Sequence, residues 1–75
     1  MIGGIFMYFY QRIRDMREDN DLSQEKVAEV LGITRQQYQL YESGKREMPM
    51  HLFITLAQHY AVSLDYLAGL KKQKT

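Results

Sequence analysis

The chain has 75 residues, 45% of them hydrophobic, and its 10 lysines and arginines against 9 aspartates and glutamates leave a net charge of +1. A chain of this length forms one domain and buries only about 60% of the surface that its unfolded form exposes, so its stability is on the order of a few kcal/mol. The absence of cysteine excludes disulfide bonds and thiolate zinc sites, and fits a reducing cytoplasm.

The apolar start, MIGGIFMYFY, lacks the basic segment and cleavage site of a signal peptide, and it is shorter than the ~20 apolar residues that a membrane span needs. Three interpretations stay open: residues 1–6 are an upstream extension before a start at Met7, the apolar side chains pack on the domain, or the arm joins two protomers. We therefore divide the chain into an apolar arm (1–7), a folded domain (8–70) and a basic tail (71–75) that we expect to be frayed.

A first helix is predicted from residue 7 or 8 to residue 19, because apolar side chains recur at helical spacing, and the sequence then breaks at Asn20 and Asp21. The spaced residues are Phe9, Ile13 and Met16. The same helix gathers basic side chains, so a nearly neutral chain can still present one cationic face. These are Arg12, Arg14 and Arg17.

Two short helices follow, over residues 24–31 and 35–43. Ser23 and Thr34 stand where helix-capping side chains are wanted, and Gly32 stands where the first of the two must end in a left-handed residue. So short a connection predicts that the two helices cross at a steep angle. Their inward residues are expected to be Val27, Ala28, Leu31, Tyr38 and Tyr41, with Ile33 filling the angle.

The second half predicts two more helices, over residues 50–60 after Pro49 and over residues 64–68 after the cap Ser63. The inward side chains expected of the longer helix are Met50, Phe53, Leu56, Ala57 and Tyr60, and those of the shorter one are Leu64 and Leu67. No segment shows the alternation of a β-strand, so the fold class is all-α with five helices.

The stretch LSQEKVAEVLGITRQQYQLYESGK resembles the helix-turn-helix motif of the Cro and phage-repressor (Xre) family. That motif requires a small residue at the position of Ala28, a glycine at the position of Gly32 and apolar residues at five further positions. The sequence meets every one of them, with Val27, Leu31, Ile33, Tyr38 and Tyr41. The likeness extends over residues 10–70 and implies a compact lambda-repressor-like domain, with the helix-turn-helix formed by its second and third helices.

The resemblance implies that the helix over residues 35–43 enters the major groove of double-stranded DNA, where the residues at its start reach base edges. The expected base-reading residues are Arg35, Gln36, Gln39 and Leu40. The expected contacts to the DNA backbone are Ser23, Gln24, Ser43, Lys45 and Arg46. In similar proteins the glutamine at Gln24 also braces the first base-reading residue.

An arginine of the first helix and a glutamate near the end of the third commonly pair in this family, which implies an Arg17–Glu42 ion pair that serves the fold. The resemblance further implies a transcriptional repressor that binds a pseudopalindromic operator as a homodimer. The alternative is an antitoxin or phage-type control protein that acts through a protein partner. Either would work in the cytoplasm, associated with the nucleoid when it binds DNA.

Enzyme motifs are lacking in the sequence. His51 and His59 stand too far apart on one predicted helix to hold one metal ion together, and no nucleophile elbow or phosphate-binding glycine loop is present. We expect no enzymatic activity, no cofactor, no metal site and no membrane association.

Overall fold

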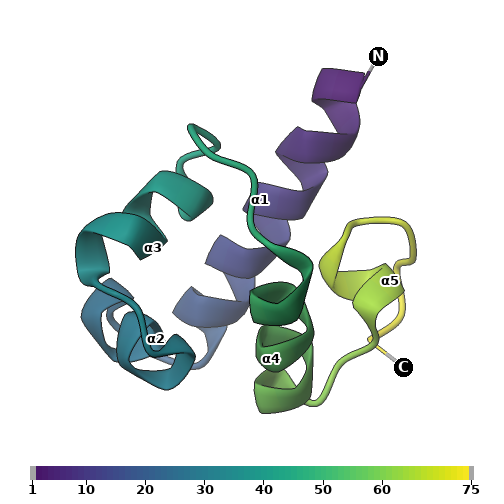
Figure 1. Ribbon diagram of the computed structural model, residues 1–75. Helices are drawn as coiled ribbons and strands as arrows, with labels where there is room; N and C mark the ends of the chain where they lie inside the picture. Colours follow the sequence, from purple (N-terminus) through teal and green to yellow (C-terminus); the bar gives the residue numbers. More distant parts are fainter. Residues whose placement is uncertain (1, 75) are drawn as a thin grey trace.

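The computed structural model describes residues 2–74, with side chains from Tyr10 onward. These residues form five helices and no strand: α1 (Ile2–Asp19), α2 (Gln24–Leu31), α3 (Arg35–Glu42), α4 (Met50–Tyr60) and α5 (Leu64–Leu67). In Figure 1, α2 and α3 form one end of the molecule and α4 and α5 the other, while α1 runs past both and its first turns project beyond the bundle. The predicted fold class, all-α with five helices, is confirmed.

The first helix starts earlier than the sequence predicted, at Ile2 rather than at residue 7 or 8. A glycine costs a helix only about 1 kcal/mol and no proline interrupts this segment, so Gly3 and Gly4 do not stop it. The inward positions Ile13 and Met16 are buried as predicted, whereas the side chain of Phe9 lies outside the described residues. The helix ends where expected: Asp21 adopts a left-handed φ of 55°, and the Leu22 N–H donates to the Arg17 carbonyl at 3.0 Å.

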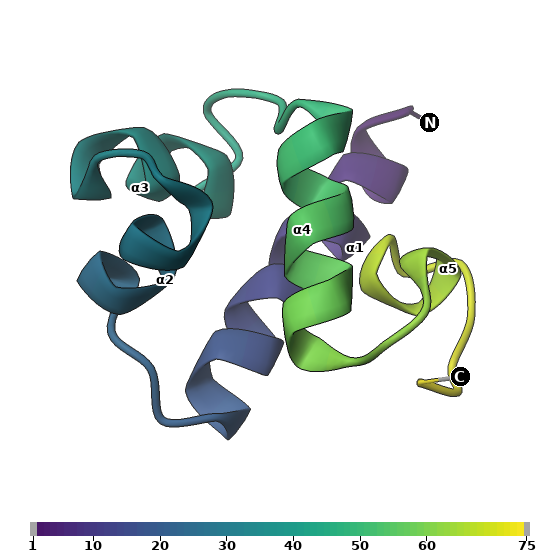
Figure 2. The ribbon, with the colours of Figure 1, turned by 60° about the horizontal axis from the view of Figure 1, so that its bottom comes forward.

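The caps predicted for α2 and α3 are present. The Ser23 hydroxyl accepts from the Lys26 N–H, and Gly32 ends α2 at φ 70°. The Thr34 and Gln37 side chains each accept from the other's backbone N–H, which forms a capping box at the start of α3. The inward residues predicted for the two helices are buried: Val27, Ala28, Leu31, Tyr38 and Tyr41. Figure 2 shows α2 and α3 crossing rather than lying parallel.

Two expectations for the second half were wrong. Met50 is 63% exposed, because it lies at the first residue of α4 and points past the edge of the inward face. Met48, in the preceding loop, is buried in its stead, and Leu52 joins the core. Leu64 is likewise exposed at the first residue of α5, while Leu67 is fully buried as predicted. In both helices the residue at the N-terminal end lies at the rim of the core.

The C-terminal tail was expected to be frayed, but residues 71–74 return to the start of α5. The Ser63 N–H donates to the Lys74 carbonyl at 2.7 Å. The Arg12 guanidinium lies 4.2 Å from the centre of the Tyr66 ring and donates to the carbonyls of Tyr66 and Lys71. Arg12 therefore joins α1 to α5 and to the tail.

Candidate nucleic-acid interface

The outward side of α3 carries three long polar side chains, which we call the outer face: Arg35, Gln36 and Gln39. All three are exposed, and none of these side chains makes a hydrogen bond or ion pair with another described residue. Gln37, between them in sequence, differs because its side chain is held in the capping box with Thr34. Leu40 is half-buried. The capped helix thus presents free hydrogen-bonding groups from its first two turns.

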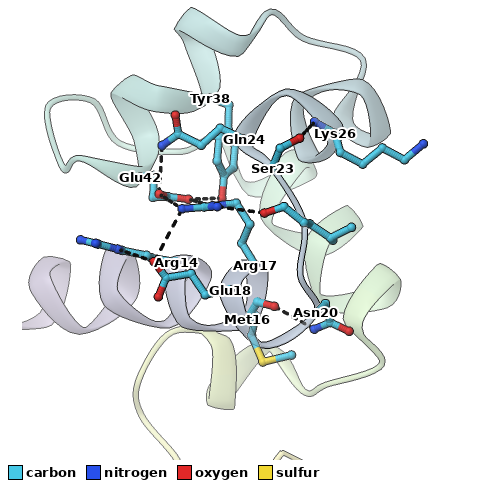
Figure 3. Close-up of polar contacts among 11 residues, drawn as sticks. Arg14, Met16, Arg17, Glu18, Asn20, Ser23, Gln24, Lys26, Tyr38 and Glu42 are labelled. Atoms are coloured by element: carbon cyan, nitrogen blue, oxygen red, sulfur yellow. Dashed lines mark hydrogen bonds and ion pairs between the residues drawn. The ribbon is translucent and has the colours of Figure 1, made fainter.

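The adjoining side of α3 is tied to the domain by four polar side chains, which we call the inner network: Arg17, Gln24, Tyr38 and Glu42 (Figure 3). Arg17 donates to both carboxylate oxygens of Glu42, from Nε at 2.8 Å and from Nη2 at 3.0 Å. The Tyr38 hydroxyl donates to Oε2 at 2.6 Å and the Gln24 amide to Oε1 at 3.0 Å. The structure thus brings together the ion pair that the resemblance implied, and adds two donors to it.

The Glu42 carboxylate is well satisfied, because its side chain is only 6% exposed yet receives four hydrogen bonds. Burial raises the pKa of Glu42, but the hydrogen bonds from Arg17, Tyr38 and Gln24 outweigh it and hold this pKa below its usual value. Burial and the bond to Glu42 raise the pKa of the Tyr38 hydroxyl. No hydrogen bond joins Gln24 to Arg35, and the Gln24 amide N–H donates to Glu42.

The expected backbone contacts lie around α3. Ser23 and Gln24 stand at the N-terminus of α2, and the Ser43 hydroxyl donates to the Leu40 carbonyl at 3.2 Å. Lys45 and Arg46 are exposed in the loop after α3, and both of their backbone N–H groups donate to the Leu40 carbonyl. The two cationic side chains are therefore carried on a loop whose backbone is fixed to α3.

Tyr10 fixes this loop from the α1 side, a role that the sequence did not predict. Its hydroxyl donates to the Arg46 carbonyl at 3.4 Å, and its ring lies 3.0 Å from where a Cβ on Gly44 would stand. Gly44 also has a left-handed φ of 81°. Glycine is needed here for both its conformation and its small size.

A shallow polar groove separates α1 from α3. It is lined by Arg14, Arg17, Gln24, Gln39, Glu42 and Ser43. The groove brings together three residues predicted to contact DNA, Gln24, Gln39 and Ser43, and adds Arg14, which we had not included among them. Lys45 and Arg46 lie outside it.

The part of the chain that the structure describes lacks two other kinds of feature, a metal-binding cluster and a membrane-spanning helix. Among residues 2–74, no three histidines, cysteines, aspartates or glutamates lie close enough to hold a metal ion. No helix in this range is both long and apolar enough to cross a bilayer.

Comparison with known proteins identifies the family. The profile of the helix-turn-helix family, of the Cro/C1 type, matches residues 13–67, the span from the core of α1 to the end of α5. The chain belongs to this family. The structural elements that the profile spans are those that form and support the outer face, and the arrangement of the five helices is that of a lambda-repressor-like fold.

Several bacterial proteins are similar to this helix-turn-helix chain. YobD of Bacillus subtilis, named as an uncharacterized transcriptional regulator, is 37% identical over 62 residues, which are 83% of this chain and 55% of that protein. RstR of Vibrio cholerae, named as the transcriptional repressor of a cryptic phage, is 36% identical over 61 residues, 81% of this chain and 55% of its own. The chain spans about half the length of these relatives. No solved structure matches it.

Proposed function

We propose that this chain binds double-stranded DNA in a sequence-specific manner by inserting α3 into the major groove. The outer face carries this proposal: three long polar side chains are exposed and unpartnered on a helix whose adjoining side is locked to the domain. An arginine can donate two hydrogen bonds to guanine, and a glutamine can donate and accept across adenine. Arg35, Gln36 and Gln39 are the proposed base-reading residues, and we propose that the half-buried Leu40 contacts a thymine methyl.

The flanking residues support contact with the DNA backbone on both sides of α3. The N-terminus of α2, at Ser23 and Gln24, directs backbone N–H groups and a partial positive charge outward. Ser43, Lys45 and Arg46 follow α3 directly. Phosphate contacts of this kind fix the position of a recognition helix without reading sequence.

We propose that the regulator represses transcription as a homodimer on a pseudopalindromic operator, in the cytoplasm, without enzymatic activity. One such module buries too little DNA surface to bind tightly, and a symmetric pair on half-sites about 34 Å apart doubles that surface. The relatives named as transcriptional regulators and the phage repressor support this role. Large apolar side chains left exposed on α4, on α5 and just after α5 suit a contact with a second copy: Met50, Ile54, Leu64 and Leu70.

The same exposed side chains also favour the second candidate, an antitoxin or phage-type control protein that acts mainly through a different protein. The nearby ring of Tyr66 is covered by Arg12 and is less suited to either contact. Sedimentation of the purified chain alone and with DNA distinguishes the two. A homodimer on DNA supports the regulator, and a monomer that binds DNA only with a co-purified protein supports the alternative.

Selection of binding sites from random duplex DNA, at ~100 mM salt, tests the proposal directly. The wild-type chain should enrich a pseudopalindrome, and the double variant Arg35→Ala/Gln36→Ala should enrich none, since each bidentate contact contributes about 1–3 kcal/mol of discrimination. Lys26→Ala/Glu29→Ala, an exposed ion pair on α2, is the control and should enrich the wild-type sequence. Failure of the folded wild type to enrich any sequence would overturn the proposal.

A further inference from the structure

The groove between α1 and α3 combines cationic, amide and hydroxyl groups on the same side of the domain as Gln39 of the outer face. Arg14 comes from α1, Gln24 from α2, and Gln39 and Ser43 from α3 and its cap. The Gln39 amide and the Nη groups of Arg14 remain available as donors, whereas the Gln24 amide donates to Glu42 and the Ser43 hydroxyl donates to the Leu40 carbonyl. Two of the charged groups that line the groove are unavailable, because Arg17 and Glu42 are consumed by their bidentate pair.

Arg14 is the one lining arginine that remains free to move. Its side chain is 59% exposed, and its partner is Glu18, one turn away on the same helix, at 3.2 Å. Glu18 itself is 52% exposed and also lies 3.9 Å from Arg17 (Figure 3). An exposed ion pair of this kind contributes little to stability, so the guanidinium can exchange its carboxylate for another anion at small cost.

Glu18 accepts a hydrogen bond only from Nε of that guanidinium, so its Nη groups remain open to a phosphate. Arginine binds phosphate through two parallel hydrogen bonds, and a phosphate held in the groove would also receive the unpartnered amide donor of Gln39. We propose that Arg14 binds a phosphate of the DNA backbone in this groove, and that Glu18 competes with this phosphate for the guanidinium. This inference rests on the proposed function, since it requires α3 to lie against DNA.

The Glu18 carboxylate should weaken the proposed contact between Arg14 and the phosphate. When Glu18 is counted together with the lining residues Arg14, Arg17 and Glu42, the two arginines and two glutamates have no net charge. An incoming phosphate must therefore displace Glu18 from Arg14 while approaching its negative charge. Replacing Glu18 by glutamine removes the competitor and leaves a groove with one net positive charge. The two variants, Arg14→Ala and Glu18→Gln, should therefore change DNA affinity in opposite directions.

The test is a salt titration of DNA binding by fluorescence anisotropy, with one selected duplex and one random duplex of ~20 base pairs. Arg14→Ala should weaken binding several-fold at ~100 mM salt on both duplexes. It should also lower the slope of log K against log[salt] by about 0.9 per protomer, the effect of losing one neutralised phosphate. Glu18→Gln should strengthen binding to both duplexes.

Lys26→Ala is the matched control. Lys26→Ala removes one positive charge, as Arg14→Ala does. The Lys26 side chain is 57% exposed and pairs with Glu29 at 3.0 Å, but it lies on α2 outside the groove. A smaller slope for Arg14→Ala than for Lys26→Ala supports the site, and equal slopes would overturn it as a general effect of net charge. Thermal unfolding of each variant checks its fold. Sequence preference should survive in Arg14→Ala, because a phosphate contact does not read bases. Absence of DNA binding by the folded wild type would instead count against the proposed function, on which this site depends.

Discussion

On the inner side of α3, Glu42 accepts four hydrogen bonds from groups of three helices, whereas on the outer side Arg35, Gln36 and Gln39 have no partner among the described residues. Both sides are polar, so polarity alone does not separate structure from function in this helix. The difference lies in whether the hydrogen-bonding groups are satisfied within the domain. A satisfied buried network holds the helix in place, and an unsatisfied exposed row remains available to a ligand.

The largest effect is expected from breaking the inner network at Glu42. Glu42→Ala leaves the Arg17 guanidinium, only 15% exposed, without its carboxylate, and leaves the Tyr38 hydroxyl without an acceptor. Removal of one partner of a buried pair costs about 3–5 kcal/mol, which is comparable to the whole stability of a domain of this size. Urea unfolding followed by circular dichroism should show a domain that is largely unfolded at 37 °C.

Two further variants show whether that loss comes from the network. Glu29→Ala removes a carboxylate that is 72% exposed and should change stability by less than about 0.5 kcal/mol. Arg17→Met/Glu42→Leu removes both charges together and should recover part of the stability, because no buried charge is left unpaired. If Glu42→Ala lowers the free energy of unfolding no more than Glu29→Ala does, α3 is held in place by apolar packing alone.

Acid should weaken the same network. The pKa of Glu42 is lower in the folded chain than in the unfolded chain, so its contribution to stability is complete above the unfolded value of about 4.5 and is lost as the pH falls through the folded value. We expect the free energy of unfolding to decline below about pH 4.5 in the wild type. Glu42→Gln removes this group and should flatten that part of the decline, and an unchanged slope would assign acid sensitivity to other carboxylates.

The helix-turn-helix region could be predicted from the sequence because its determinants are local. Ser23, Gly32 and Thr34 act within three or four residues of their own positions, and the spacing of Val27, Leu31 and Tyr38 fixes which side of each helix is buried. The early start of α1 was missed because Gly3 and Gly4 do not stop the helix. The exposure of Met50 and Leu64 was missed because residues at a helix end can lie at the rim of the core without any change in the apolar pattern.

Long-range partners were harder to predict than local caps. The Arg17–Glu42 pair was implied only by the family resemblance, since 25 residues separate the two in sequence. The donors Gln24 and Tyr38, the contact of Tyr10 with the loop after α3, and the position of Arg14 in the groove depend on how α1 packs against α3. No spacing rule encodes that packing, so the sequence identified the outer face but not the contacts that support it.

Tyr60 provides a smaller test of the comparison, because its hydroxyl is buried near the network but unpaired. No described group lies within hydrogen-bonding distance of this oxygen, and burial raises the pKa of Tyr60 to about 12. Tyr60→Phe removes an unsatisfied polar atom and should leave stability unchanged or raise it by up to about 1 kcal/mol. Tyr38→Phe removes a hydroxyl that donates to Glu42 and should lower stability by about 1–3 kcal/mol. Equal losses in chemical denaturation would show that hydrogen-bond satisfaction does not distinguish the two rings.

The smallest change in stability is expected at the outer face itself. Arg35→Ala/Gln36→Ala removes two exposed side chains that touch no partner, so the free energy of unfolding should stay within about 0.5 kcal/mol of the wild type. The same variant should lose sequence discrimination, and urea unfolding measured beside DNA binding separates the two properties. Stability lost in step with binding would mean that these side chains help to fold the domain, and the argument from unsatisfied groups to base reading would then fail. Stability kept while discrimination disappears would assign the outer face to base reading, because these side chains would then contribute to binding and not to folding.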